Sequence, residues 1–459
     1  MCQAPQLYPF QAEGVKHLLR RRCVLLADEM GLGKTVQAAV AIDQLFEGNS
    51  IRRALIVCPA SLSRNWRHEI HQWSPRTPVV LYEGADRYGM LEGNIPVLVG
   101  SYETIAGDLR RFTRDGTFHY DIGIDLLVLD EAQRIKDPGS LKSKVFSRLL
   151  APRRWAITGT PLENHPRELA SILRFLFPNE FATKEAIDDP ALTLSLKDTS
   201  IVRRIKSQVG AQLPSKTVSY VPLALSPEQG AEYAQACDEI AQTVRNAVSL
   251  ASASATLLGG LQTLRRLAVL SSSGDSAKID FLTEEVEDLA EQGEKIVVFS
   301  SFANLVLPTV ASRLREYGSL LYTGEMSAEE REVVHNRFLH DPSSRVMCAS
   351  LKAAGVGLTW TVAAYVYHLD IWWNPQVLRQ AEDRVHRIGQ KNPVLVKRLI
   401  SEGTIEEGIR ELLAAKEEIF DLVITEKADN PSDPKFLPQL LSLIGLKMSD
   451  LRCSRRRRK

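Results

Sequence analysis

Cysteine is scarce in this sequence, and the cysteine pairs that bind zinc or build a disulfide framework are missing. The six cysteines are scattered, and no two of them form a C-x-x-C pair. Cys23, Cys58 and Cys348 lie in apolar runs typical of buried strands, which predicts reduced, buried thiols and no zinc site. We therefore expect an intracellular protein, in the cytoplasm or nucleoid of a prokaryote or in the nucleus of a eukaryote.

Long apolar runs and an excess of charge are absent as well. No run reaches the length of a membrane-spanning helix, and the N-terminus has no signal-peptide pattern. The 57 basic residues are balanced by 56 acidic ones, so the net charge is only +1. These features argue against a membrane protein and against a uniformly basic binder of nucleic acid. Any nucleic-acid surface must therefore be a local stripe.

The order of apolar runs predicts two α/β domains. A chain of 459 residues is too long for one compact core. Strand-like runs alternate with helical patterns from residue 23 to 160 and again from residue 295, which is typical of parallel sheets covered by helices on both faces. The expected strands are residues 23–27, 54–58, 97–100, 126–130 and 155–158, and then residues 295–299, 320–322, 346–349, 365–369 and 395–399. Residues 61–73 predict an amphipathic helix with Ser61 as its N-cap.

The segment between the two domains has a different pattern. Residues 163–276 are largely helical in pattern, notably residues 226–268, and residues 271–275 resemble a linker. The last expected helix covers residues 405–422, and a polar, proline-containing stretch follows it. The predicted domains are residues 1–165, a helical insertion and linker at 166–275, residues 276–425, and a tail at 426–459. The basic end, residues 455–459, is expected to be a disordered, solvated end, and contact with DNA or a nuclear address is the alternative.

The most informative stretch is DEMGLGKTVQ, residues 28–37. It lies between an apolar strand and a helix over Lys34–Glu47, and such a glycine-rich turn directs backbone N–H groups and a helix N-terminus at a phosphate. Lys34 can reach the β- and γ-phosphates of ATP, and the Thr35 hydroxyl can hold Mg²⁺. Asp28 stands where the strict P-loop pattern has glycine, and a tight turn on a surface loop is the alternative. The candidate ATP-binding residues are Asp28, Glu29, Met30, Gly31, Leu32, Gly33, Lys34 and Thr35.

An acidic pair follows a second buried strand of the same domain. Asp130 and Glu131 come directly after the apolar run 126–129, and ligands bind at the carboxyl ends of strands in such sheets. Asp130 can hold Mg²⁺ directly or through water, and Glu131 can orient and deprotonate the attacking water. By itself, the pair would also fit the solvated start of a helix.

The second domain carries two arginines with a matching role. Asn374 is a good N-cap and Pro375 a good first helical residue, so Arg384 and Arg387, three residues apart, are expected to share one helix face. Two guanidinium groups suit a triphosphate whose charge is redistributed in the transition state. A solvated charged face is the alternative for an isolated helix, but the P-loop and the acidic pair favour catalysis. ATP is expected between the two domains.

These motifs, in this order, resemble the Swi/Snf-like ATPases, the helicase-related DNA translocases of superfamily 2. The resemblance runs from about Leu7 to Ile409. It implies that Gln11 reads adenine and that Gln133 takes the place of a more usual histidine beside the acidic pair. It also covers the segments 55–62, 100–104, 156–164, 203–206, 213–216, 350–358 and 370–375. Thr359-Trp360 stands where Asn-Leu is common.

The resemblance also implies a path for nucleic acid. Small polar side chains and backbone N–H groups suit contacts with phosphates, and such contacts do not depend on base sequence. Taken singly, most of these residues are ordinary turn formers, and Trp372 and Trp373 are more typical of a core than of a stacking surface. The candidate contacts are Pro59, Ser61, Ser101, Tyr102, Ser300, Thr323, Gly324, Lys352, Gly357, Thr361 and Trp373.

The predicted protein is therefore an ATP- and Mg²⁺-dependent translocase on double-stranded DNA, built from two RecA-like domains in tandem with a helical insertion. It is expected to remodel or displace protein–DNA complexes without separating the strands. A strand-separating RNA or DNA helicase and a scaffold subunit with little ATPase activity are the alternatives. Since no further recognition module fits in the sequence, a protein partner or a separate targeting subunit is expected.

Overall fold

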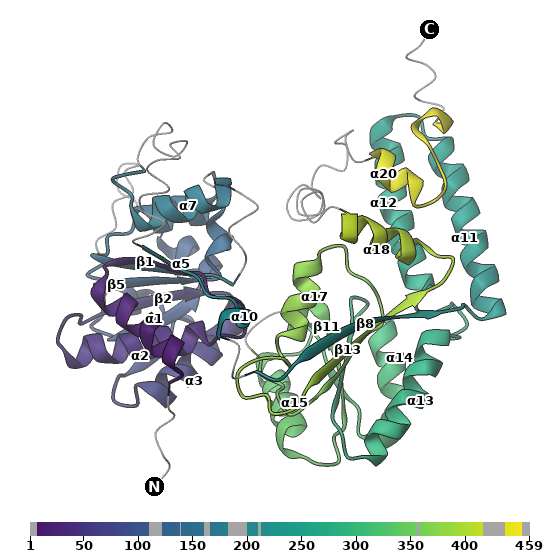
Figure 1. Ribbon diagram of the computed structural model, residues 1–459. Helices are drawn as coiled ribbons and strands as arrows, with labels where there is room; N and C mark the ends of the chain where they lie inside the picture. The colour runs from purple at the N-terminus through teal and green to yellow at the C-terminus, as the bar shows by residue number, and fades with distance from the viewer. Residues whose placement is uncertain are drawn as a thin grey trace. The chain divides into compact units, whose positions relative to one another are not determined.

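The computed structural model describes residues 7–109, 122–137, 139–159, 166–181, 200–209, 213–354, 358–415 and 437–451. The chain divides into two compact units, Met1–Leu213 and Pro214–Lys459, which are considered separately below. Each unit is built on one parallel sheet (Figure 1). Both predicted parallel sheets are thereby confirmed.

The first unit contains a seven-stranded sheet with the order β3-β4-β2-β5-β6-β1-β7, in which every neighbouring pair is parallel. The strands are β1 (Cys23–Leu26), β2 (Ala54–Cys58), β3 (Val79–Leu81), β4 (Val97–Ser101), β5 (Leu126–Asp130), β6 (Arg153–Ile157) and β7 (Ile201–Val202). The helices are α1 (Pro9–Arg20), α2 (Lys34–Glu47), α3 (Ser63–Trp73), α4 (Tyr88–Glu92), α5 (Tyr102–Leu109), α6 (Leu141–Arg148), α7 (Pro166–Leu176) and α10 (Lys206–Val209), with 3₁₀ turns η1 (Ala60–Leu62) and η3 (Ala132–Ile135).

The central strands of this sheet are apolar throughout because both of their faces are covered. Every residue of β2, β4 and β5 is buried. Leu55 and Leu127 belong to one core cluster, which they share with residues of α5, α6 and α7. Helices α1, α2 and α3 form the other layer, where Trp66 and Ile70 are fully buried. Near-continuous apolar runs are the expected signature of such doubly covered strands.

The second unit contains a six-stranded parallel sheet with the order β10-β11-β9-β12-β13-β8. Its strands are β8 (Lys216–Leu223), β9 (Ile296–Ser300), β10 (Leu320–Tyr322), β11 (Val346–Ser350), β12 (Tyr365–His368) and β13 (Val394–Ser401). Its helices are α11 (Pro227–Arg245), α12 (Leu250–Leu267), α13 (Ala277–Glu291), α14 (Val306–Arg313), α15 (Ala328–His340), α16 (Leu351–Ala354), α17 (Pro375–Glu382), α18 (Ile405–Ala415) and α20 (Leu437–Ser442), with 3₁₀ turns η4 (Arg315–Tyr317) and η5 (Met448–Asp450).

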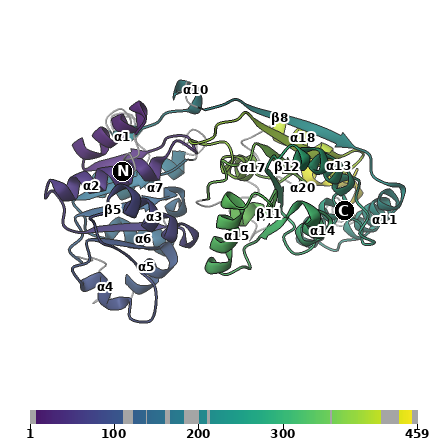
Figure 2. The same cartoon turned by 90° about the horizontal axis from the view of Figure 1, so that it is seen from below.

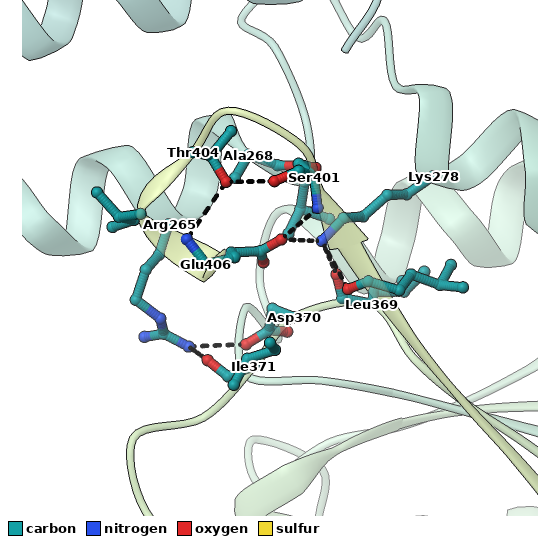
Figure 3. Close-up of polar contacts among 12 residues, drawn as sticks. Arg265, Ala268, Lys278, Leu369, Asp370, Ile371, Ser401, Thr404 and Glu406 are labelled. Carbon is teal, nitrogen blue, oxygen red and sulfur yellow. Dashed lines mark hydrogen bonds and ion pairs between the residues drawn. The ribbon is translucent and has the colours of Figure 1, made fainter. Parts of the chain in front are cut away.

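The long helices α11 and α12 form an antiparallel hairpin within this second unit (Figure 1). They share a core cluster with α18 and with the segment around α20, which contributes Leu441, Ile444 and Leu446. Part of the predicted tail, residues 437–451, is thus packed against the hairpin. Asp370, Arg265, Lys278 and Glu406 lie at the base of this cluster in two buried ion pairs (Figure 3).

Two strands lie inside the segment that was predicted to be largely helical, so this prediction was wrong for β7 and β8. Most of β8 is exposed, and the strand lies at the edge of its sheet (Figure 2). An edge strand with polar residues between its apolar ones has no strong apolar run, which explains why the pattern did not reveal it. The predicted linker 271–275 is also a hydrogen-bonded turn, in which Ser271 N donates to Asp275 O over 3.0 Å.

The predicted cap of the third helix was also wrong. Helix α3 begins at Ser63 after the turn η1, and the preceding Leu62 makes no side-chain cap hydrogen bond. Ser61 is exposed within the turn. In contrast, α2 has the predicted bounds, Lys34–Glu47, with Gly48 after its last turn.

Candidate active site

Five chemically important segments meet at the carboxyl edge of the first sheet. Because all seven strands are parallel, the residues that end or follow β1, β2, β4, β5 and β6 lie at the same edge. These residues include the P-loop, Pro59–Ser61, Ser101–Tyr102, the Asp130–Glu131 pair and Thr158. The fold thus brings together the groups that the sequence suggested separately.

The P-loop has a backbone suited to phosphate. Gly31 and Gly33 have φ angles of 84° and 70°, which favour glycine over other residues. Gly33 is the N-cap of α2 and supplies no side chain to satisfy the first N–H groups of this helix. A phosphate is the ligand that such a helix N-terminus prefers.

Lys34 turns back over the same loop. Its Nζ donates to the carbonyl oxygens of Asp28 and Glu29, at 2.8 and 3.2 Å. Gly159, which follows β6, lies so close that an added Cβ would come within 3.0 Å of this nitrogen. The ammonium group is therefore held at the mouth of the loop, where a phosphate would compete with the carbonyl oxygens for it.

Asp28, which breaks the usual P-loop pattern, is a buried anchor. Its carboxylate accepts from Arg204 Nε at 2.9 Å, from Arg204 Nη2 at 2.5 Å and from Gln37 Nε2 at 3.1 Å. The backbone N–H of Lys206 donates to Glu29 Oε2 over 2.7 Å. These contacts fix the loop from the side of residues 204–206, and they occupy the carboxylate that was predicted to bind ATP.

Gln11 lies against the P-loop from helix α1. It is 4% exposed, and its Nε2 donates to Leu32 O over 3.3 Å. Its Oε1 accepts from Tyr8 N at 3.1 Å. Gly14, one turn later, allows close packing, because a Cβ there would lie 1.9 Å from Gln37 Oε1. The position of Gln11 beside the P-loop is compatible with its predicted role in reading adenine.

The acidic pair combines a buried and a partly buried carboxylate. Asp130 Oδ2 accepts from Trp66 Nε1 at 2.8 Å, and Asp130 Oδ1 accepts from Glu131 N at 2.9 Å. Burial, and then the neighbouring charge of Glu131, raises the pKa of Asp130 to about 7. Glu131 itself has a φ of 52°, an unusual conformation for a non-glycine residue. The negative charge of the two neighbouring carboxylates is poorly compensated, and this suits a bound cation.

A chain of hydrogen bonds joins this pair to the end of β6. Gln133 Nε2 donates to Glu131 Oε2 over 2.6 Å, and Thr158 Oγ1 donates to Gln133 Oε1 over 2.9 Å. Gln133 therefore uses both ends of its amide. The order Thr158–Gln133–Glu131 physically connects the segment at 156–159 with the candidate base.

The donors fit Mg²⁺ only if phosphate completes the coordination. Among the described residues, no three His, Cys, Asp or Glu side chains cluster as a metal site. Mg²⁺ in nucleotide-hydrolysing enzymes is typically held by one or two protein oxygens together with phosphates and water. Thr35 at the start of α2 and Asp130 at the end of β5 are of the right chemical type for this arrangement.

The predicted helix face of the two arginines is wrong. Helix α17 does begin at Pro375 with Asn374 as its cap, whose side chain accepts from Gln376 N, but it ends at Glu382. Arg384 and Arg387 lie beyond it in an irregular segment, residues 383–390, which we call the arginine segment. Helical spacing therefore does not relate the two guanidinium groups.

Tertiary contacts hold the arginine segment in place. Arg387 Nη1 donates to Leu358 O at 3.1 Å and to Thr359 Oγ1 at 2.9 Å. Trp360 N donates to Arg384 O over 2.7 Å. Thr359 and Trp360, the two residues that depart from the family pattern, are thus direct partners of Arg387 and Arg384.

The candidate nucleic-acid contacts divide into exposed and buried residues. In the first unit Ser61 is exposed, whereas Pro59, Ser101 and Tyr102 are buried. The Tyr102 hydroxyl donates to Asp130 O over 2.9 Å, so this side chain supports the acidic pair. Its predicted contact with phosphate therefore has no support from its position.

The second unit brings only some of its candidates together. Ser300 ends β9, and Thr323, Gly324 and Trp373 follow strands at the carboxyl edge of the sheet, where Gly324 is exposed. Thr361 instead precedes β12, beside Gly389 of the arginine segment. The Lys352 side chain and Gly357 lie outside the described residues, as do residues 455–459 and residues 160–165.

Ser300 and Trp373 are both part of a buried network around Asp370. Ser300 Oγ and Ser301 N donate to Asp370 Oδ1, at 2.7 and 2.8 Å. Arg265 Nη2 donates to Asp370 Oδ2 over 2.8 Å (Figure 3), and the guanidinium carbon lies 5.6 Å from the Trp373 ring centroid. Trp373 is 6% exposed, so it belongs to the core rather than to a stacking surface.

Several supporting residues were missed by sequence reasoning. Trp66 and Arg265 act through contacts with distant residues, and only Trp66 carried a local signal, as an apolar position of its helix. Thr158 lies in the segment 156–164 covered by the resemblance, but its bond to Gln133 could not be read from the sequence. Arg204 was noted as part of a family signature, but its partner Asp28, 176 residues away, could not be read from spacing.

Comparison with known proteins agrees with these motifs. The SNF2-related domain family matches residues 10–269, and the helicase conserved C-terminal domain matches residues 277–389. An uncharacterized ATP-dependent helicase of Mycoplasma pneumoniae is 32% identical over 444 residues, covering 91% of this chain and 42% of that protein. The putative ATP-dependent helicase/translocase YwqA of Bacillus subtilis is 29% identical, covering 91% of this chain and 49% of that protein.

Among solved structures, the Sulfolobus solfataricus SWI2/SNF2 ATPase core in complex with dsDNA is 28% identical, covering 96% of this chain and 98% of that one, with a TM-score of 0.43. The chain spans less than half the length of the two curated relatives above. No helix among the described residues is long and apolar enough to cross a membrane. Since the SNF2-related match covers more than half of the sequence and a helicase C-terminal domain follows it, the chain belongs to the SNF2-related family of ATP-dependent helicases.

Proposed function

We propose that this chain is an ATP-driven translocase on double-stranded DNA that remodels or displaces protein–DNA complexes. The observation that carries the proposal is the assembly of P-loop, acidic pair and Thr158–Gln133–Glu131 chain at one sheet edge. ATP hydrolysis needs a phosphate cradle, a cation ligand and a positioned base, and this edge supplies all three types of group.

In the proposed reaction, Lys34 and the N–H groups at the start of α2 bind the phosphates. Bound Mg²⁺, with Thr35 and Asp130 as its protein ligands, would supply neutralisation of the developing phosphate charge. Glu131 accepts a proton from the attacking water, and Gln133 keeps its carboxylate oriented. Arg384 and Arg387 stabilise the charge of the transition state, which requires the two units to close on the nucleotide.

The proposed movement along DNA uses contacts that ignore base sequence. Exposed turns at the carboxyl edges, such as Ser61 and Gly324, suit phosphate contacts. The Thr158–Gln133–Glu131 chain offers a route by which the state of the nucleotide alters the segment after β6. Alternating closure and opening would then move the protein along one strand, with 3′→5′ polarity if the family rule holds.

The name of the Bacillus subtilis relative, a putative helicase/translocase, is compatible with two activities. A strand-separating helicase acting on DNA or RNA is therefore the alternative. We assign recognition of the protein–DNA complex that is remodelled to a protein partner or a separate targeting subunit. DNA as the substrate would place the protein in the nucleoid of a prokaryote or in the nucleus of a eukaryote.

One preparation tests the proposal with two assays. ATP-dependent displacement of a triplex-forming third strand reports translocation, and a forked duplex reports strand separation. We expect triplex displacement without unwinding, and stronger stimulation of ATPase by duplex DNA than by single strands or RNA, whose groove and phosphate geometry differ. Efficient unwinding without triplex displacement, or stimulation by RNA alone, would reject the translocase in favour of a conventional helicase.

A further inference from the structure

The arginine segment is not a regular helix, so its geometry depends on tertiary contacts as well as on local turns such as the bond from His386 N to Glu382 O. Several of these come from residues 358–363 of the same unit. One more comes from Pro214, the first residue of the second unit, and Lys216 bonds Glu382, the residue directly before the segment. The chain that arrives from the first unit is therefore bonded to the segment that carries the two arginines.

The first contact is an ion pair at the end of α17. Glu382, only 1% exposed, accepts from Lys216 Nζ at 2.8 Å and from Arg398 Nη2 at 2.6 Å, and it lies 3.4 Å from His368 Nε2. Burial raises the pKa of Glu382, but the contacts with His368, Arg398 and Lys216 lower it by a larger amount. The net pKa is below its ordinary value, so the carboxylate is ionised. Because burial lowers the pKa of His368, Lys216 and Arg398 carry the compensating charge.

The second contact lies on the other side of Arg384. His386 Nε2 is 2.8 Å from Pro214 O, a distance at which the ring N–H donates to the carbonyl oxygen. Between the two contacts, Val394 N donates to Ser215 O over 2.9 Å. Three consecutive residues, 214–216, are thus fixed, and the outer two are attached to positions 386 and 382, two residues on either side of Arg384.

We propose that Lys216 and His386 are positioning residues, which clamp the arginine segment to the chain that joins the two units and so make hydrolysis depend on the placement of that chain. This inference rests on the proposed function, in which Arg384 and Arg387 act on ATP. Any displacement of residues 214–216 acts on both flanks of Arg384 at once. A shift of about 1 Å in a catalytic group can cost on the order of a hundredfold in rate.

The contact between Lys216 and Glu382 can be removed without leaving the carboxylate of Glu382 unpaired. Lys216→Met removes one cation from Glu382, while Arg398 still neutralises the carboxylate. Lys397→Met is the matched control, because Lys397 pairs with Glu285 of α13 in the same unit, and both residues are about as exposed as Lys216. Neither residue of the control pair contacts the arginine segment in any described hydrogen bond or ion pair.

Steady-state ATPase with saturating duplex DNA gives the first test. We expect Lys216→Met to lower kcat by roughly tenfold or more, with the KM for ATP and the DNA concentration for half-activation within about twofold of wild type. Lys216→Arg should restore most of the rate, His386→Phe should resemble Lys216→Met, and Lys397→Met should keep the wild-type kcat. An equal loss in Lys397→Met, or an unchanged kcat in Lys216→Met, would overturn the proposal.

Hydrogen–deuterium exchange provides a readout that does not need activity. Amides of residues 383–390 should exchange faster in Lys216→Met than in wild type, whereas Lys397→Met should leave them unchanged. If wild type proves inactive as an ATPase, the proposed function fails, and the exchange experiment alone then decides whether the clamp exists. Unchanged exchange in both Lys216→Met and His386→Phe would overturn it.

Discussion

Arg204 forms a two-point ion pair with Asp28, with Nη2 2.5 Å from Oδ2 and Nε 2.9 Å from Oδ1. The carboxylate is fully buried at the start of the P-loop, and the arginine comes from the segment after β7. The pair explains why an acidic residue replaces the first glycine of the usual phosphate-binding pattern. It ties the loop to the end of the first unit, so the shape of the phosphate site depends on residues far away in sequence.

Loss of this pair should weaken both stability and nucleotide binding. Arg204→Met leaves Asp28 buried without its cation, which typically costs about 3–5 kcal/mol, and Arg204→Lys cannot form the two-point contact. We expect urea unfolding to show a large loss in the free energy of unfolding for Arg204→Met and a smaller loss for Arg204→Lys. ATP binding should be weaker in both variants. Arg134→Met is the control, since its pair with Glu103 is exposed and should contribute less than about 1 kcal/mol. Equal effects at Arg204 and Arg134 would contradict this account.

Catalytic variants should separate binding from turnover. Lys34→Ala should weaken ATP binding because it removes the phosphate-contacting ammonium group. Glu131→Gln should bind ATP and lose turnover, because the amide cannot accept the proton of water. Arg387→Ala should also bind ATP but lose on the order of 10³-fold in kcat. Equilibrium binding and single-turnover hydrolysis check these outcomes, and wild-type turnover by Glu131→Gln would disprove the role of the base.

The bond from Thr158 to Gln133 should control the coupling between hydrolysis and DNA, whereas Gln133 should affect both hydrolysis and coupling. Gln133→Ala breaks the contacts with both Glu131 and Thr158, while Thr158→Val breaks only the second. We expect Thr158→Val to keep basal ATPase within a few-fold and to lose most of the stimulation by DNA, whereas Gln133→Ala should lower both. The ratio of stimulated to basal rates measures the effect. Full stimulation in Thr158→Val would show that the hydrogen-bond chain carries no coupling.

The buried pair Lys278–Glu406 should be replaceable as a unit but not singly. Both side chains are 1% exposed, with Nζ 2.5 Å from Oε2 (Figure 3). Burial lowers the pKa of Lys278 and raises that of Glu406, so each charge depends on its partner. Lys278→Met or Glu406→Leu alone should cost about 3–5 kcal/mol, and the double variant should be much closer to wild type. Denaturant unfolding of the four proteins completes the double-mutant cycle, and additive losses would contradict the prediction.

Glu382 should contribute stability at neutral pH that is lost in acid. Its pKa in the folded protein is below the ordinary value of 4.5, so the unfolded chain binds the proton first as the pH falls. The contribution is therefore complete above about pH 5 and disappears as the pH drops through the folded-state pKa. Glu382→Gln should be less stable than wild type at pH 7, and the difference should narrow towards pH 3. A constant difference across this range would count against an ionised Glu382.

The local chemistry of the active site could be read from the sequence. Asp28, Lys34 and Thr35 lie in one short turn, and Asp130 and Glu131 directly follow one apolar run. The strand–turn–helix order is fixed by apolar periodicity, so most strands of both sheets and helix α2 have the expected positions within a residue or two. Short motifs of this kind depend on backbone geometry, which neighbouring residues dictate.

The contacts between distant segments were decided by tertiary structure alone. The regular helix ends at Glu382, and although Arg384 N still donates to Ala381 O, Arg384 O accepts from Trp360 N and the Arg387 side chain is bonded to Leu358 and Thr359. The edge strand β8 pairs with β13 although most of its side chains are exposed. Tyr102 and Trp373, which as single residues could have faced DNA, are buried by the helices packed over them. Periodicity determines which segments form strands and helices, but the choice of partner depends on packing and buried charge, whose energies arise only when residues far apart in sequence meet.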